Sequence, residues 1–159
     1  MERRTPLAKK ASTELADIPA PGREYQELWF ALSRDPWRTV VLVPADRGIS
    51  AVYIAEALGH VVRWLREPPA TIMTMSDPLD YVEATQLSHR IPTEDPGGTS
   101  GKVIVAVQPV VVEPLGLAVT RTADAVVLCI EKGRSRLASV RRTIDLVGRD
   151  RIRGCIFVR

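Results

Sequence analysis

Residues 39–50 read TVVLVPADRGIS, and the architecture of the chain follows from them. Their first five positions form an apolar, β-branched run without polar alternation, which is typical of a strand that helices cover on both faces. After the turn, apolar residues recur at helical spacing until Pro68 and Pro69; they are Ile54, Leu58, Val61, Val62 and Leu65. The sequence therefore predicts a buried strand, a turn and an amphipathic helix, in that order.

Strand-like and helical segments alternate along the rest of the chain. Further strand-like apolar runs occupy residues 71–75, 103–107, 125–130 and 154–158. Helical patterns occupy residues 23–33, 77–86, part of 109–123, and 135–147. Strands that alternate with helices favour parallel pairing through right-handed crossovers. We therefore expect an α/β fold of three layers, in which helices cover both faces of a mainly parallel sheet of about five strands.

The last helical pattern, at residues 135–147, predicts which side of the helix faces the core. Its apolar stripe is expected to face the core and comprises Leu137, Val140, Ile144 and Val147. Its arginines are expected to face solvent, and Gly148 follows as a stop signal.

Composition indicates one globular domain. The chain has 159 residues, of which 45% are hydrophobic and 26% are charged, and its net charge is +3. Residues 1–22 are polar and rich in proline, so we expect a flexible N-terminal arm followed by one domain at 23–159. Residues 90–102, with two prolines and three glycines, predict a loop. Neither a leader peptide nor a membrane span is recognisable, which favours a cytoplasmic protein.

The cysteines and histidines do not predict a metal site or a disulfide framework. Cys129 and Cys155 each lie in an apolar run and are expected to be small core residues. His60 and His89 lie far from them in the sequence, without metal-ligand spacing.

The turn after the first strand is the place where an open α/β sheet binds ligands. A phosphate-binding loop there reads G-x-x-x-x-G-K-[ST], in which lysine neutralises phosphate and the hydroxyl binds Mg²⁺. Gly48 and Ser50 match this pattern, but Ile49 takes the place of the lysine. Asp46 is expected to place a repelling charge in the cradle, which Arg47 at most offsets. The alternative is an ordinary turn between strand and helix.

A second glycine-rich stretch, GGTSGKV at residues 97–103, looks like such a loop at first sight. It precedes a strand, however, and Val103 lacks the hydroxyl that would meet the metal. We expect a plain loop here.

Over residues 23–159 the chain resembles the bacterial tyrosine autokinases of capsule and exopolysaccharide systems, which are deviant P-loop relatives of the MinD-type ATPases. The most similar segments are TADAVVLCIEKGRSRLASVRR at 122–142 and GCIFV at 154–158. In that family a helix with E-x-x-R-x-x-R precedes the first strand. This chain keeps Glu24 there, with Glu27 at the position of the first arginine.

The resemblance also shows which functional positions have changed. The D-x-D motif of the family falls on residues 75–77, so only its second aspartate, Asp77, is kept. Val107 stands where the D-x-P-P motif has its magnesium-associated aspartate, and Val158 stands where the adenine is read by asparagine. With Ile49, these changes identify the chain as a degenerate P-loop-like member without cofactor or metal.

The resemblance implies a non-catalytic pseudokinase or pseudo-ATPase that acts as a binding or regulatory module in exopolysaccharide biosynthesis and export. Its partner would be a membrane-anchored polysaccharide copolymerase, which would recruit it to the inner membrane, and a homo-oligomer stays open. The expected interfaces are the first helix, with Glu24 and Glu27, and the basic helix, with Arg134, Arg141 and Arg142.

Two alternatives belong to other classes. One is a weakly active ATPase or tyrosine kinase that uses Lys102 or Arg47 in place of the missing lysine. The other is a basic surface for nucleic acid or anionic lipid. Acidic residues interrupt the basic C-terminal region and no aromatic residue is interleaved for base stacking, so nucleic acid is not the expected partner.

Overall fold

The computed structural model describes residues 19–90 and 101–159. Most of the predicted N-terminal arm and most of the predicted loop at 90–102 lie outside these residues. The described end of the arm contacts the domain, because the carbonyl oxygen of Pro19 lies 2.9 Å from Nε2 of His60.

The sheet has five strands that are all parallel, which confirms the predicted fold class. The strands are β1 (Thr39–Pro44), β2 (Thr71–Thr74), β3 (Val103–Ala106), β4 (Ala125–Glu131) and β5 (Ile152–Val158). They lie in the order β2-β3-β1-β4-β5, so β1 is the central strand. Every residue of β1 is buried, as its uninterrupted apolar run predicts.

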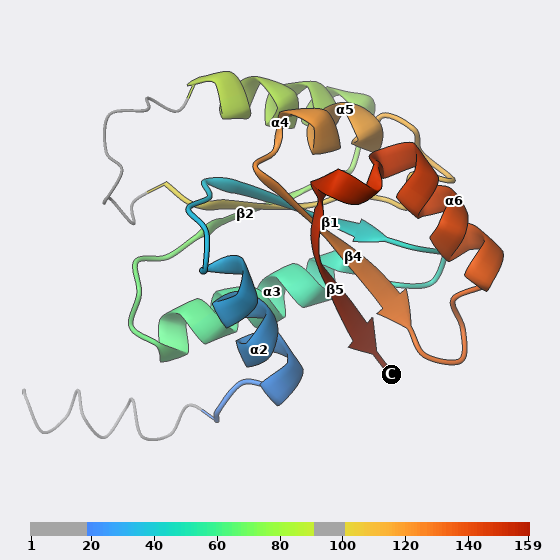
Figure 1. The fold of residues 1–159 in the computed structure, drawn as a ribbon. Helices are drawn as coiled ribbons and strands as arrows, with labels where there is room; N and C mark the ends of the chain where they lie inside the picture. Colours follow the sequence, from blue (N-terminus) through green and yellow to red (C-terminus); the bar gives the residue numbers. More distant parts are fainter. Residues whose placement is uncertain (1–18, 91–100) are drawn as a thin grey trace, which may run out of the picture.

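Helices cover both faces of the sheet and complete the three layers (Figure 1). One face carries α2 (Arg23–Leu32) and α3 (Ala51–Trp64), and the other carries α4 (Pro78–Arg90), α5 (Gly116–Thr122) and α6 (Leu137–Val147). A 3₁₀ turn, η1 (Arg149–Arg151), leads into β5. Val40 and Leu42 of β1 belong to the first core, whereas Val41 and Val43 belong to the second. Among the described helices, none is long and apolar enough to cross a membrane.

The chain connections decide where a site can form. From the carboxyl end of β1 the chain passes to α3 on one face, while β3 and β4 lead to α5 and α6 on the other face. Neighbouring strands whose connections diverge in this way open a crevice at their carboxyl ends. The crevice beside β1 is therefore the position that the fold provides for a ligand.

Two predictions of burial were wrong. Leu137 is 63% exposed, because α6 meets the core through Thr143 and Val147 in its second half. Cys155 is exposed as well, because β5 is an edge strand that α2 covers on one face only. Gly154 lies against Leu28 of α2, so the next residue, Cys155, points to the uncovered face.

Candidate functional site

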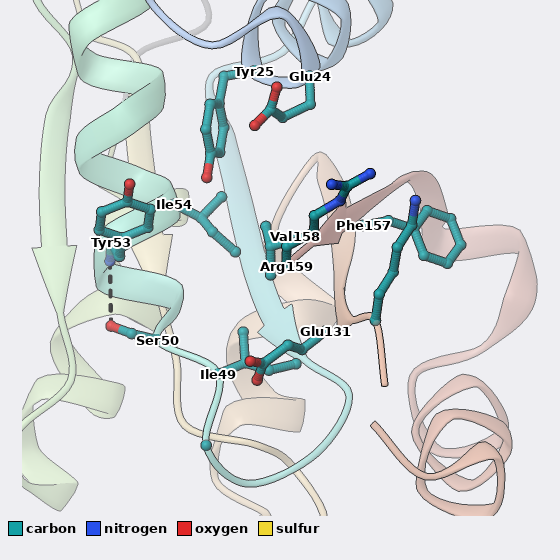
Figure 2. Close-up of a pocket in the computed structure, with 12 residues that line it drawn as sticks. Glu24, Tyr25, Ile49, Ser50, Tyr53, Ile54, Glu131, Phe157, Val158 and Arg159 are labelled. Atoms are coloured by element: carbon teal, nitrogen blue, oxygen red, sulfur yellow. Dashed lines mark hydrogen bonds between the residues drawn. The ribbon is translucent and has the colours of Figure 1, made fainter. Parts of the chain in front are cut away.

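A cavity of about 690 Å³ lies at the carboxyl ends of β1, β4 and β5 (Figure 2). This volume is within the range of small-molecule sites. Its lining combines aliphatic side chains (Ile49, Ile54, Val158), aromatic rings (Tyr25, Tyr53, Phe157) and charged groups (Glu24, Glu131, Lys132, Arg159). The lining residues come from α2, the β1–α3 turn, α3 and the ends of β4 and β5, so the cavity occupies the crevice that the topology predicts.

The backbone of the turn between β1 and α3 differs from that of a phosphate-binding loop. Gly48 is its only residue with a positive φ, at 93°. A nest pairs a residue of negative φ with one of positive φ, and a phosphate-binding loop repeats this pairing over several residues so that several N–H groups converge. The other residues of this turn keep negative φ, which is what side chains in place of the motif's glycines impose.

Asp46 does not point into the cavity, which corrects the prediction of a repelling charge there. Its Oδ2 accepts a hydrogen bond from the backbone N–H of Arg136 at 3.1 Å, and its Oδ1 accepts one from the N–H of Arg47 at 2.8 Å. These two backbone hydrogen bonds are the main reason why the pKa of Asp46 lies below its ordinary value. The carboxylate of Asp46 therefore binds the backbone at the start of α6.

The two residues that follow Gly48 are also engaged in the fold. Ile49 is partly buried and packs against the core between the sheet and the α2–α3 layer. The hydroxyl of Ser50 accepts a hydrogen bond from the backbone N–H of Tyr53 at 3.3 Å and so caps α3 (Figure 2). Arg47 is exposed and is not among the residues that line the cavity.

Besides Asp46 and Arg47, two further predicted site residues lie away from the cavity. Asp77 caps α4, because its Oδ1 accepts hydrogen bonds from the N–H groups of Leu79 at 2.7 Å and Asp80 at 3.3 Å. Val107 is only 3% exposed and belongs to the core on the α4–α6 side. The structure therefore brings together Gly48, Ile49, Ser50 and Val158 of the predicted site, but not Asp46, Arg47, Asp77 or Val107.

Several residues of the cavity were missed by sequence reasoning. Tyr25 belongs to the buried stripe of α2, which hides its second role at the cavity. Burial, followed by the nearby Tyr53 and Glu24, raises the pKa of Tyr25. Glu131 and Lys132 stand at the carboxyl end of β4, and this position next to the β1 turn was the available signal.

The predicted interface residues are distributed over two surfaces. Glu24 lines the cavity, whereas Glu27 is exposed and pairs with Arg23 at 2.8 Å. Arg134 pairs with Glu131 at 3.5 Å. Arg141 and Arg142 are exposed on α6.

Lys102 is far from the cavity in the topology. It precedes β3 at the amino end of the sheet, and its Nζ lies 4.7 Å from the ring centre of Trp37 and 5.1 Å from that of Trp29. These contacts place it at the opposite end of the sheet from the β1–α3 turn.

The fold and the cavity define a three-layer α/β protein of the P-loop-like type. Compared with known proteins, the chain matches no family model and no curated protein. Within the described ranges, no group of three or more histidine, cysteine, aspartate or glutamate residues is arranged to hold a metal ion.

Proposed function

We propose that this protein is a non-catalytic relative of P-loop nucleotide-binding proteins that acts as a binding or regulatory module. The proposal rests on one observation: the residues of the β1–α3 turn make contacts that hold the fold together. Asp46 binds the start of α6, Ile49 packs on the core and Ser50 caps α3. Ile49 offers phosphate no charge, and the polar groups of Asp46 and Ser50 already take part in hydrogen bonds that hold the fold.

The resemblance at residues 122–142 and 154–158 supports a role in bacterial exopolysaccharide biosynthesis and export. In this proposal the chain is cytoplasmic and docks on a membrane-anchored polysaccharide copolymerase, which recruits it to the inner membrane. Binding replaces catalysis, so neither a nucleotide nor a metal is required as a cofactor.

The catalytic alternative needs a cation at the phosphates to replace the missing lysine. The ammonium group of Lys102 lies over two tryptophan rings at the amino end of the sheet, and Arg47 is exposed outside the cavity. Val107, at the position of the magnesium-associated aspartate, is a buried core residue. These placements favour the non-catalytic function.

The partner is tested by co-expression of the chain with the full-length, membrane-anchored copolymerase from the same genome. We expect the chain to sediment with the membrane fraction only when the copolymerase is present. Glu24→Lys with Glu27→Lys should reduce this recruitment, because both residues belong to α2, the helix that the resemblance assigns to contacts. The matched control is Glu56→Lys, an exposed charge reversal on α3. Equal amounts in the membrane fraction with and without the copolymerase would reject this partner.

A further inference from the structure

The helical layer formed by α4, α5 and α6 has an acidic flank. We define it as residues 77–86 of α4 and its cap with residues 107–115, which lead into α5. These two segments carry Asp77, Asp80, Glu83 and Glu113 but neither lysine nor arginine. Large aliphatic side chains are exposed among these charges, with Leu79 at 76% and Val82 at 52%.

The opposite end of the same layer is a basic flank, which we define as residues 132–142. It carries Lys132, Arg134, Arg136, Arg141 and Arg142 without an acidic residue. The side chains of Arg134 and Arg136 remain 74% and 83% exposed although each has an ion-pair partner. Leu137, which lies between these cations in the sequence at the start of α6, is exposed as well.

The two flanks lie at opposite ends of one layer. α5 lies between α4 and α6 and packs against both helices (Figure 1). The sheet beneath runs in the same direction, from β2 at one edge to β5 at the other. One molecule therefore presents an acidic surface with exposed aliphatic groups at one end and a basic surface with an exposed leucine at the other.

We propose that the acidic flank of one molecule binds the basic flank of a second copy, head to tail. Opposite charges meet in this arrangement, whereas a two-fold pairing of like flanks would oppose charges of the same sign. Leu79 and Leu137 supply apolar groups that lose contact with water on association. Because the two surfaces differ, the contact is heterologous, and repetition produces a ring or an open row. The proposal is independent of the role in exopolysaccharide assembly.

Sedimentation velocity over a concentration series tests this contact. Leu79→Lys with Glu83→Lys disrupts the acidic flank and spares Asp77 and Asp80, which cap α4. Leu137→Glu with Arg141→Glu disrupts the basic flank. Glu56→Lys with Arg63→Glu, on α3 at the opposite face, is the matched control. Thermal unfolding followed by circular dichroism confirms that each variant is folded.

We expect the average mass of the original protein to rise with concentration and to fall as salt increases from about 50 mM to about 500 mM. Each disrupted flank should weaken self-association by about tenfold or more, whereas the control should associate normally. An equimolar mixture of the two flank variants should associate more strongly than either variant alone, because each variant keeps one intact flank. A monomer at every concentration in low salt, association that survives both flank changes, or a mixture without complexes would overturn the proposal.

Discussion

Asp46 and Arg136 are 90 positions apart, yet the carboxylate of Asp46 accepts a hydrogen bond from the backbone N–H of Arg136 at 3.1 Å. A second contact joins the same two elements, because the buried hydroxyl of Thr143 donates to the carbonyl oxygen of Ala45 at 3.3 Å. Together these contacts fasten the turn after β1 to α6. The turn that a nucleotide-binding protein uses for phosphate is here part of the packing between the sheet and a helix.

Asp46→Asn should destabilise the fold. The change removes the charge and replaces one of the two accepting oxygens by an NH₂ group, which cannot accept from a backbone N–H. Asp46 is only 8% exposed, and we expect the free energy of unfolding to fall by about 1–3 kcal/mol at neutral pH. The measurement is urea unfolding at pH 7, with Asp145→Asn on the exposed side of α6 as the control.

The loss of stability in Asp46→Asn should depend on pH. The pKa of Asp46 is lower in the folded state than in the unfolded state. The ionised carboxylate therefore makes its full contribution to the free energy of unfolding above the unfolded pKa of about 3.9. It is lost as the pH falls through the still lower folded pKa. The difference in stability between the original protein and Asp46→Asn should therefore shrink in acid. A difference that stays constant down to pH 3 would contradict this assignment.

The two cysteines should differ in reactivity. Burial raises the pKa of both thiols, but Cys129 is fully buried whereas Cys155 is exposed on the edge strand. In the native protein we expect a thiol-specific chromogenic reagent to modify Cys155, faster as the pH rises, and to reach Cys129 only after unfolding. Cys155→Ser should abolish the native reaction. Equal modification of both thiols in the folded protein would show that the core around Cys129 of β4 does not pack as described.

Lys102 should contribute to stability and not to ligand binding. Its ammonium group lies over the rings of Trp29 and Trp37, which meet edge to face with centres 5.6 Å apart. Lys102→Met keeps the aliphatic stem but removes the charge, so we expect a loss of about 0.5–2 kcal/mol in chemical unfolding. Tryptophan fluorescence should report the change directly. A variant as stable as the original protein, with unchanged emission, would refute this role.

The buried strands were predictable because their chemistry is local. A run such as residues 39–43, apolar and β-branched throughout, fits a strand between two helical layers and little else. The edge strand β5 shows where local pattern is insufficient. Its run at 154–158 is as apolar as the others, but only its neighbours determine that one face stays uncovered.

The roles of the charged residues were less predictable, because they depend on partners distant in sequence. Nothing in the sequence near Asp46 indicates that its carboxylate accepts a hydrogen bond from the backbone N–H of Arg136. Asp77, by contrast, precedes a proline and a helical pattern, and a cap was predictable there from the sequence. The cavity lies where the rule for carboxyl ends of strands places a candidate site, while its aromatic lining depends on how α2 packs beside α3.

The central claim, that the phosphate site has been lost, is tested most directly by thermal unfolding with and without millimolar Mg²⁺ and ATP. Controls contain Mg²⁺ alone and salt at matched ionic strength. We expect an unchanged melting temperature, because a ligand stabilises a protein only by binding its folded state. Binding with a Kd near one hundredth of the ATP concentration would instead raise the melting temperature by roughly 5–10 °C in a domain of this size. A magnesium-dependent rise of that order would contradict the non-catalytic assignment.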